Sequence, residues 1–387
     1  MFPPALRILH LNSLLTGGGT DNQCVALASG LHQLGQKVWL LGPDNREYSR
    51  IARERLVPFH AAPPEGPLKL RFIAAAAKFI RRERVQIVHG HHGRDIWPTF
   101  LAAHLSGVRP KVVVTRHMAK SPRSVLTRII MLSQCDALIA VSHFVEKILR
   151  EGAYEPQSPE RERHRRPPVR GDHAKVHVIH GGIDTEHFQP AEAPELRLKL
   201  GLKPGDYAFA VAGGYDLPRG KGQREFLQAG ARIHEQCPRA RFLIIGRGSM
   251  ESILKEDIAR LGLSGTAWLT PYFTDMPAVM NAIDCLVHPQ IGTEALGLVV
   301  CEAHACGKPV IASALDGIPE AFDAGKLGQL VKPESIEELA AAMRDWAERP
   351  ALSFPARMEI HARVREQFSF PTSTARTLAL YEKLISG

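Results

Sequence analysis

The sequence lacks the long apolar segments of membrane proteins and of secreted precursors. In 387 residues no apolar run reaches the roughly 18 residues that a spanning helix needs, and the longest candidates are interrupted by Lys78, Arg128 and Asp136. Near the N-terminus Arg7 and His10 interrupt the apolar stretch, and glycines follow where a cleavage site would stand. These absences favour a protein inside the cell, and we expect it in the cytoplasm.

The sequence also lacks paired cysteines. Its 6 cysteines are scattered, without a C-x-x-C pair. Cys301, His304 and Cys306 stand close enough together to raise the question of zinc. They lie in an Ala-rich helical pattern with no second ligand pair, so we interpret them as buried small side chains. No metal site is predicted.

Positive charge is concentrated in the first half. Residues 1–190 carry 27 Lys and Arg against 16 Asp and Glu, a net charge of 27 − 16 = +11, and residues 191–387 carry 22 against 24, a net charge of −2. The asymmetry predicts that the first half meets an anionic surface or molecule.

Two stretches supply much of this charge. Lys69–Arg84 reads as a basic amphipathic helix with Leu70, Phe72, Ile73, Ala77 and Ile80 on its apolar side. Its apolar stripe is expected to face the core of its own domain, while the basic face could contact lipid headgroups. The second stretch, 161–170, lies in a Pro-rich loop over 154–173, whose one aromatic residue besides histidine is Tyr154. Nucleic acid is not an expected partner, because stacking aromatics are missing.

Strand and helix patterns alternate twice along the chain, which predicts an α/β protein with two doubly wound parallel sheets. Pro190–Pro204 looks like the boundary between the two halves. Any ligand is expected in a central cleft, at the carboxyl ends of the strands. The expected strands are 7–11, 37–41, 87–89, 111–115, 137–141 and 176–179, then 208–212, 241–245, 267–269, 285–288 and 309–312.

Helices are expected after both glycine-containing loops. Thr20 and Gln23 fit a capping box after Gly17-Gly18-Gly19. In the second half, helices are expected from about Gln223 and over 250–261, 299–305 and 336–349.

The segment Pro289–Glu320 carries the strongest chemical signal. Glu294 precedes a predicted helix and Glu302 lies inside it, with Gly297 between them. The N–H groups at a helix N-terminus bind anions, and two carboxylates can hold hydroxyl groups. A sugar nucleotide presents both kinds of group.

The E-x7-E spacing, the following A-x-x-C-G-K-P-V-I-A-S run and the later G-I-P-E closely resemble the family 4 glycosyltransferases. The resemblance covers nearly the whole chain and includes Ala140–Ser142, Val178–Pro190 and Phe368–Leu384. It implies the GT-B fold, two Rossmann-like domains facing a cleft, with the acceptor-binding domain at 1–190, the nucleotide-sugar domain at 191–365 and a C-terminal helix at 366–387 that crosses back.

The resemblance also implies roles for individual residues. Glu302 would bind the ribose, Glu294 and His117 would orient the transferred sugar, and Lys221 with Arg219 would stabilise the diphosphate. The remaining implied donor-binding residues are Gly17, Gly18, Gly19, Gly246, Gly248, Tyr272, Ala295, Leu296 and Gly297. Without the resemblance, the glycine loop would be a plain turn and Lys221 a solvated side chain. His89, His91 and His92 are interpreted as polar residues at a strand end, because no carboxylate or cysteine completes a metal site.

Two positions depart from the family pattern. Gly213-Gly214-Tyr215 stands where the family usually has an Arg after the strand, and Arg219 is the candidate replacement. Arg247 stands where Asp is common. These departures bear on the choice of donor more than on the fold.

The implied activity is retaining transfer of a sugar from a nucleotide-diphosphate sugar to an acceptor hydroxyl. The resemblance also implies that no metal or other cofactor is needed, and no D-x-D motif is present. Because the first domain is basic, we expect an anionic glycan or glycolipid acceptor, as in bacterial lipopolysaccharide core or other cell-envelope synthesis. The protein could then be peripheral on the inner face of the cytoplasmic membrane. Sugar-nucleotide epimerisation and a degenerate nucleotide-binding relative are the alternatives.

Overall fold

The computed structural model describes residues 4–44, 46–63, 69–153, 166–218 and 220–387. The chain forms two compact units, Met1–Gly182 with Phe370–Gly387 (unit 1) and Ile183–Ser369 (unit 2). Residues 161–165 of the arginine-rich stretch at 161–170, and Arg219, lie outside the described residues.

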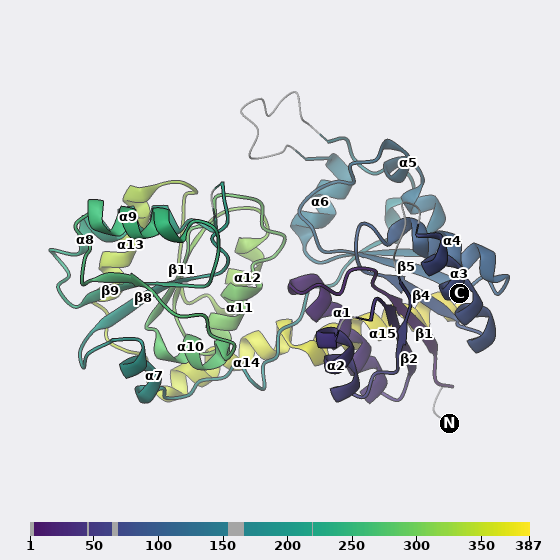
Figure 1. Ribbon diagram of the computed structural model, residues 1–387, viewed down its shortest axis with the longest axis horizontal. Helices are drawn as coiled ribbons and strands as arrows, with labels where there is room; N and C mark the ends of the chain where they lie inside the picture. Colours follow the sequence, from purple (N-terminus) through teal and green to yellow (C-terminus); the bar gives the residue numbers. More distant parts are fainter. Residues whose placement is uncertain (1–3, 45, 64–68, 154–165, 219) are drawn as a thin grey trace. The chain divides into compact units, whose positions relative to one another are not determined.

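Unit 1 contains a parallel sheet with the strand order β3-β2-β1-β4-β5-β6-β7 (Figure 1). The strands at 7–11, 37–41, 87–89, 111–115, 137–141 and 176–179 are confirmed to within one residue at each end. β3 was not predicted, because it has three residues and none of them is buried. The strands are β1 (Arg7–Leu11), β2 (Lys37–Gly42), β3 (Phe59–Ala61), β4 (Ile87–Gly90), β5 (Lys111–Arg116), β6 (Ala137–Ala140) and β7 (Val176–Val178), and the α-helices are α1 (Gly19–Gln33), α2 (Arg46–Glu54), α3 (Leu70–Glu83), α4 (Ile96–Ser106), α5 (Val125–Gln134), α6 (His143–Glu151) and α15 (Phe370–Ser386).

The start of α1 differs from the predicted capping box. Gly18 is the N-cap residue, and no side chain caps the helix. The Gln23 amide instead donates to the backbone oxygen of Gly182 (2.6 Å) and accepts from its N–H (2.9 Å). The capping box predicts a contact of Gln23 within its own helix, whereas the structure shows a contact with a residue far away in the sequence.

The C-terminal helix α15 belongs to unit 1. It packs against α1, and Gly30 in α1 leaves the space that Thr374 of α15 occupies, since a Cβ at Gly30 would lie 2.6 Å from the Thr374 hydroxyl oxygen. The Tyr381 hydroxyl lies 2.5 Å from Nδ1 of His89, so the last helix reaches the buried end of β4.

Unit 2 repeats the architecture with the strand order β10-β9-β8-β11-β12-β13. Successive residues of β8 enter opposite cores, Ala208 and Ala210 on one face and Phe209 and Val211 on the other, so both faces of the sheet are covered. The elements are β8 (Tyr207–Ala212), β9 (Ala240–Ile245), β10 (Ala267–Leu269), β11 (Cys285–His288), β12 (Val310–Ser313), β13 (Gly328–Val331), α7 (Pro194–Lys199), α8 (Gln223–Ile233), α9 (Glu251–Arg260), α10 (Met276–Ala282), α11 (Leu298–Ala305), α12 (Ile318–Gly325), α13 (Ile336–Ala347) and α14 (Phe354–Phe368).

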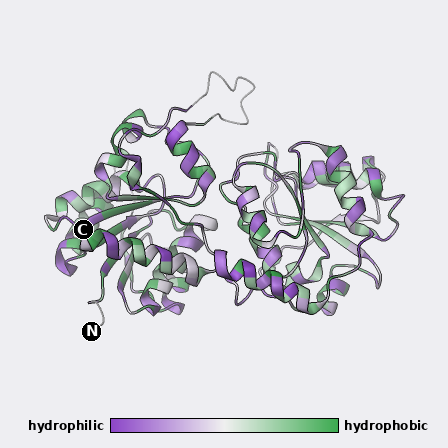
Figure 2. Ribbon diagram, turned by 180° about the vertical axis from the view of Figure 1, so that it is seen from behind, coloured by the Kyte–Doolittle hydropathy of each residue, from purple (hydrophilic) through white to green (hydrophobic). Residues whose placement is uncertain are grey.

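The five strands and four helices predicted in this half are confirmed, with ends that shift by at most two residues. β13 was missed. The two parallel sheets are those of the two Rossmann-like domains expected from the sequence. In Figure 2 apolar colours dominate the strands of both units, and polar colours fall mainly on the helices around them.

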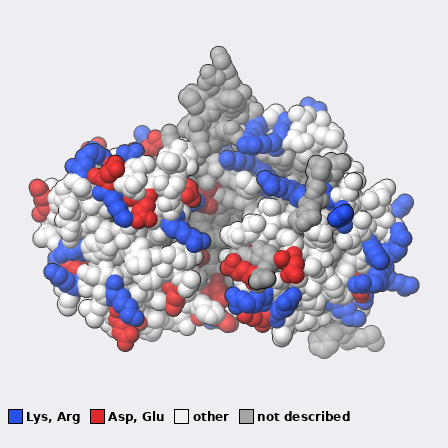
Figure 3. Space-filling view, viewed as in Figure 1, with Lys and Arg blue, Asp and Glu red and all other residues white. Residues whose placement is uncertain are grey.

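The basic helix forms as α3, and its apolar stripe is buried as expected at Phe72, Ile73, Ala77 and Ile80. Leu70 is an exception, because its side chain is 65% exposed. Figure 3 shows Lys and Arg side chains along the surface over α3 and α4. No helix among the described residues combines the length and the apolar character that membrane crossing requires.

The structural interpretation of Cys301, His304 and Cys306 is confirmed. Both thiols are free and buried, and His304 uses Nε2 to bond the backbone oxygen of Leu327 at 2.9 Å. This group therefore fills the core between α11 and its neighbours.

Candidate active site

An ion pair occupies the carboxyl edge of the unit 2 sheet. Lys221 lies in the loop between β8 and α8, and Glu294 lies in the loop between β11 and α11. Lys221 Nζ and Glu294 Oε2 are 2.8 Å apart. Burial raises the pKa of Glu294, but the charge and hydrogen bond of Lys221 outweigh it, so the net pKa is lowered. The carboxylate is therefore ionised at neutral pH.

A glycine makes this pairing possible. Gly222 has φ +89°, and a Cβ there would lie 2.0 Å from the backbone oxygen of Pro289. Its missing side chain lets the loop of Lys221 pack directly on the loop that leads to Glu294.

Glu302 faces no protein partner. It lies on α11 one turn beyond the helix start and is partly exposed, and its carboxylate forms no hydrogen bond or ion pair with any described residue. Burial raises the pKa of Glu302 to about 7. An acceptor of this kind is completed by a ligand that donates hydrogen bonds, and a vicinal diol has two hydroxyl groups to donate.

The start of α11 partly matches the predicted anion site. Gly297 is the N-cap residue with φ +87°. The Ala295 N–H is engaged, because it hydrogen-bonds to Glu294 and helps to lower the pKa of that carboxyl group. Leu296 is buried. Of the three predicted backbone donors, Ala295 therefore already donates its N–H group to the Glu294 carboxylate.

The loops after β8 and β9 are joined by Tyr215. Its side chain is 3% exposed, and its hydroxyl donates to the backbone oxygen of Gly246 at 3.2 Å. A Cβ at Gly248 would lie 2.4 Å from the Tyr215 carbonyl carbon. Tyr215 therefore holds the loop of Gly246 and Gly248 in place, and its departure from the family pattern has a packing explanation.

Arg247 points to another surface of the same loop. Its guanidinium carbon lies 4.5 Å from the centre of the Tyr272 ring. Tyr272 is 57% exposed, so its ring and the stacked cation form a flat, solvent-facing platform at the carboxyl edge.

Unit 1 has its own polar group at the carboxyl edge of its sheet, organised by Asp21. This carboxylate is 1% exposed and accepts hydrogen bonds from the Gly17 N–H (2.9 Å) and the Asn12 amide (2.8 Å). His92 Nε2 lies 2.7 Å from its Oδ1 atom. Burial raises the pKa of Asp21, but these bonds outweigh it and the net pKa is lowered. Asp21 thus fixes the start of the glycine loop and the orientation of His92.

His117 follows β5, is half-buried, and lies beside a group of buried histidines. It stacks on His91 with ring centres 6.0 Å apart, and its Nε2 atom is buried without a partner among the described atoms. Burial lowers the pKa of His117 to about 3, so the ring is neutral. His117 and His91 also line a small cavity of about 30 Å³, which is roughly the volume that one water molecule occupies in the liquid.

His89 and His91 are strand-end polar residues, as the sequence indicates. His89 Nε2 lies 2.6 Å from the Thr115 hydroxyl, and His91 Nε2 lies 2.9 Å from Nδ1 of His10. The nitrogens of His10, His89 and His91 are close enough together for a metal, but both ring nitrogens of His89 already have protein partners. These contacts favour a hydrogen-bonded network of neutral rings.

Sequence reasoning placed Lys221 and Glu294 in one site but missed Asp21, His10 and Asp316. Asp316 accepts from the Glu294 N–H at 3.1 Å and so holds its backbone. Asp21 had a signal, because it is an acidic residue two positions after the glycine loop. His10 and Asp316 stand alone in the sequence, and only the packing of β1 beside β4, and of the loop after β12, reveals them.

Two family models match the chain. A model described as Glycosyltransferase Family 4 matches residues 17–158, and one described as Glycosyl transferases group 1 matches residues 207–349. The first lies on unit 1 and the second on unit 2.

Individual proteins give the same indication. The chain is 31% identical over 224 residues to a D-inositol 3-phosphate glycosyltransferase of Mycobacterium marinum, an alignment that covers 56% of this chain and 47% of that protein. The chain thus spans about half the length of the curated relatives it matches. A glycosyltransferase from Rickettsia africae has a TM-score of 0.81 at 20% identity, covering 99% of both chains. HepE from Anabaena, in complex with UDP-glucose, has a TM-score of 0.76 at 20% identity, covering 96% of this chain and 99% of that chain.

The raised pKa of Glu302 predicts a pH-dependent stability. A folded-state pKa of about 7, above the usual 4.5, means that stability falls as pH rises from 4.5 to about 7. Glu302→Gln removes this loss, so we expect its melting temperature relative to the parent to rise between pH 5 and pH 8. Glu256→Gln, at an exposed position of α9, is the matched control. A Glu302→Gln difference that does not change with pH would contradict the assignment.

Removing the Asp21 charge should destabilise unit 1. Asp21→Asn loses charge-assisted bonds to Gly17 and His92, and we expect a decrease of about 1–3 kcal/mol in the free energy of unfolding at pH 7. Because the folded pKa is lowered, the difference should shrink as pH falls through the folded pKa. Asp44→Asn, an exposed control, should change the denaturation midpoint little. Equal effects of the two substitutions in urea denaturation would argue against the network.

Proposed function

We propose that this chain, which belongs to the family 4 (group 1) glycosyltransferases, moves a sugar from a nucleotide-diphosphate sugar to a hydroxyl group of an anionic acceptor, with retention of configuration. The observation that carries the proposal is the Lys221–Glu294 pair beside the unpartnered Glu302. One edge of unit 2 then presents a cation for phosphate, an ionised carboxylate for sugar hydroxyls and a second carboxylate for a ribose diol.

Each group has a defined task in this reaction. The bond between the anomeric carbon and the diphosphate oxygen breaks, and Lys221 stabilises the charge that gathers on the leaving oxygen. The acceptor hydroxyl bonds to the same face of the sugar, and its proton passes to the departing phosphate. Glu294 is held by Lys221 and Ala295, which suits it to orient hydroxyl groups rather than to attack carbon.

A second cation would assist the leaving group. Arg219 was assigned this task from the sequence and lies outside the described residues. Arg247, stacked on Tyr272, is a described cation at the same edge of the sheet. We propose that the Arg247–Tyr272 platform receives the base of the nucleotide, with Gly246 and Gly248 shaping its loop.

Unit 1 would supply the acceptor side. The Gly17 N–H is bonded to Asp21, which fixes the glycine loop, so Gly18 and Gly19 are its proposed backbone donors. The neutral His117 ring can exchange hydrogen bonds with a sugar hydroxyl without adding charge. The HepE structure contains UDP-glucose, so UDP-sugars are the first donors to test.

The acceptor is proposed to carry phosphate or another anionic group. Support comes from the net charge of +11 over residues 1–190 and from the Mycobacterium relatives, which are D-inositol 3-phosphate glycosyltransferases. The second candidate acceptor is larger and also anionic: a glycan of the cell envelope, such as lipopolysaccharide core. Comparing the rate of sugar transfer to inositol 3-phosphate with the rate of transfer to a phosphorylated glycolipid distinguishes the two candidate acceptors.

Membrane contact would follow for a lipid-linked acceptor. On α3 the exposed cations Arg71, Lys78 and Arg82 point away from the core. Lys69 and Arg81 act internally, because Lys69 Nζ lies 3.7 Å from Asp95 and Arg81 donates to the backbone oxygens at the end of α4. The membrane test is therefore limited to the three solvent-facing positions.

Replacing Lys221 should separate catalysis from folding. With Lys221→Ala we expect at least a hundredfold loss of kcat with the preferred donor, because a transition-state charge loses its partner. Lys199→Ala, at an exposed position on α7, should retain activity. Thermal shifts with UDP, GDP, ADP and CMP identify the base beforehand, since a ligand at 100 times its Kd adds about 2.7 kcal/mol. Full activity of Lys221→Ala would refute the assigned site, and product formed from donor alone would indicate epimerisation instead.

Charge reversal tests the membrane proposal. Arg71, Lys78 and Arg82 changed together to Glu should strongly reduce sedimentation with vesicles containing anionic lipid, because each basic residue near such a surface contributes about 1 kcal/mol. The control changes Lys199, Lys203 and Arg232, three exposed cations of unit 2, to Glu. If both triple variants bind vesicles as the parent does, the membrane role is wrong.

A further inference from the structure

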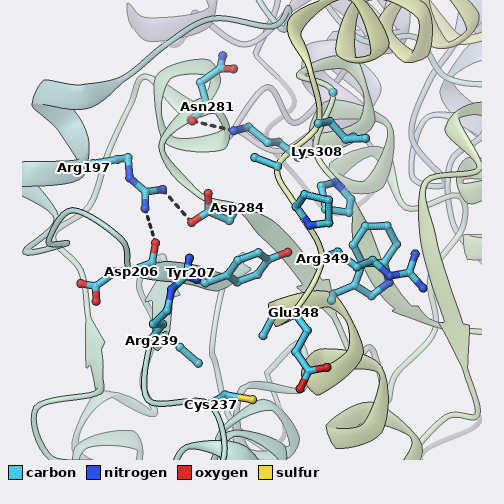
Figure 4. A pocket seen from close by; sticks show the side chains of 18 of the residues that line it. Arg197, Asp206, Tyr207, Cys237, Arg239, Asn281, Asp284, Lys308, Glu348 and Arg349 are labelled. Carbon is cyan, nitrogen blue, oxygen red and sulfur yellow. Dashed lines mark hydrogen bonds and ion pairs between the residues drawn. The ribbon is translucent and has the colours of Figure 1, made fainter.

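Unit 2 has a large cavity far from the proposed donor groups. Its volume is about 990 Å³, at the upper end of the range of small-molecule sites. Figure 4 shows that residues from several loops surround it. Asp206, Ala240, Asp284 and Pro309 stand at or directly before the first residues of β8, β9, β11 and β12, so the cavity lies at the amino edge of the sheet. Glu294 and Lys221 stand at the opposite, carboxyl edge.

The acidic residues of the cavity wall are largely engaged with protein groups. Asp206 pairs with Arg241 at 2.9 Å and accepts from the Lys203 N–H at 2.7 Å. Asp284 pairs with Arg197 at 2.9 Å and accepts from the Ala208 N–H at 2.7 Å. Glu192 pairs with Arg357 at 3.0 Å. Glu348 is the remaining lining carboxylate, and it is exposed to solvent.

Three lining cations have no such partner. Lys308, Arg239 and Arg349 form no ion pair with any described carboxylate. Lys308 Nζ donates to the Asn281 backbone oxygen at 3.0 Å, which leaves two N–H groups of the ammonium. Burial, and then the positive charge of Arg357, lower the pKa of Lys308 to about 8. An anion beside Lys308 would stabilise its charged form and so raise this pKa.

Helix capping explains part of this positive charge but not all of it. Arg357 donates to the Cys306 backbone oxygen at the end of α11, and Arg197 donates to the Ala282 oxygen at the end of α10. Cations are favourable at such helix ends. Arg239 and Arg349 are exposed, and Arg349 lies with its guanidinium carbon 4.2 Å from the centre of the Trp346 ring. Capping therefore accounts for Arg357 and Arg197. Arg239 Nε donates to the Gly205 backbone oxygen at 2.7 Å, which leaves Lys308 and Arg349 for a ligand.

The rest of the wall is apolar and rigid. Tyr207, Cys237, Trp346 and Leu352 line the cavity, together with prolines at 194, 238, 309 and 350. Rings and prolines lose little conformational freedom when they contact a ligand. The wall thus combines a flat apolar surface with unpaired cations, a combination suited to a molecule that has an organic body and a negative group.

From this geometry we infer that the cavity at the amino edge of the unit 2 sheet is a second binding site, for a small organic anion whose phosphate or carboxylate meets Lys308 and Arg349 and whose ring or aliphatic body lies against Trp346. The site is separate from the proposed donor site and does not depend on it. α11 runs from one to the other, with Gly297 at its start and Gly307 and Lys308 just after its end.

Titration calorimetry of the full chain with phenyl phosphate and with benzoate tests the inference, with phenol as the neutral counterpart. We expect saturable binding of at least one anion and none of phenol. Lys308→Gln, which can still donate to Asn281, and Arg349→Gln, at an exposed position, should each weaken binding at least tenfold. Comparing the two anions distinguishes a phosphate site from a carboxylate site.

Two control variants locate the binding. Arg344→Gln, an exposed change on α13, and Lys221→Ala, at the opposite edge of the sheet, should both keep the parent affinity. Absence of binding at millimolar anion would overturn the inference. Binding that is lost in Lys221→Ala but kept in Lys308→Gln and Arg349→Gln would also overturn it, because the anion would then occupy the donor site.

Discussion

Parallel strand pairing determines where chemistry can occur in each unit. Because all strands of a sheet run in one direction, the loops that follow them meet at one edge, and residues far apart in sequence become neighbours. Lys221 and Glu294 are separated by 73 positions, yet their charged atoms are 2.8 Å apart. The pairing of β8 with β11, and the absence of a side chain at Gly222, bring them together.

The two units handle buried polar groups differently. In unit 1 burial keeps His10, His91 and His117 neutral, and the buried carboxylate of Asp21 is held by three hydrogen bonds. In unit 2 burial leaves Glu302 with a raised pKa and no partner. A group left unpaired at a surface-accessible position costs stability, and this cost is the expected sign of a ligand site.

Unit 2 also uses both edges of its sheet. The carboxyl edge combines one ion pair with a free carboxylate and a stacked Arg–Tyr platform, whereas the amino edge has unpaired cations over an apolar wall. Helix ends contribute to the difference, since the start of α11 faces the first edge and its C-terminal carbonyls face the second. The direction of the helices thus gives the two edges opposite chemical character.

The sequence by itself determined the α/β architecture, most strand positions and the candidates Glu294 and Glu302, because hydrophobic runs and glycine positions are local signals. Lys221 became a candidate only through the resemblance to the family. The sequence could not determine the true partner of Gln23, the packing role of Tyr215 or the unpredicted strands β3 and β13, since these depend on contacts between distant segments. The position of Asp21 near the glycine loop was visible in the sequence, but its partners were not. Only the tertiary structure decided that its carboxylate joins Asn12, Gly17 and His92, because a hydrogen-bond network exists only where folding brings its members within about 3 Å.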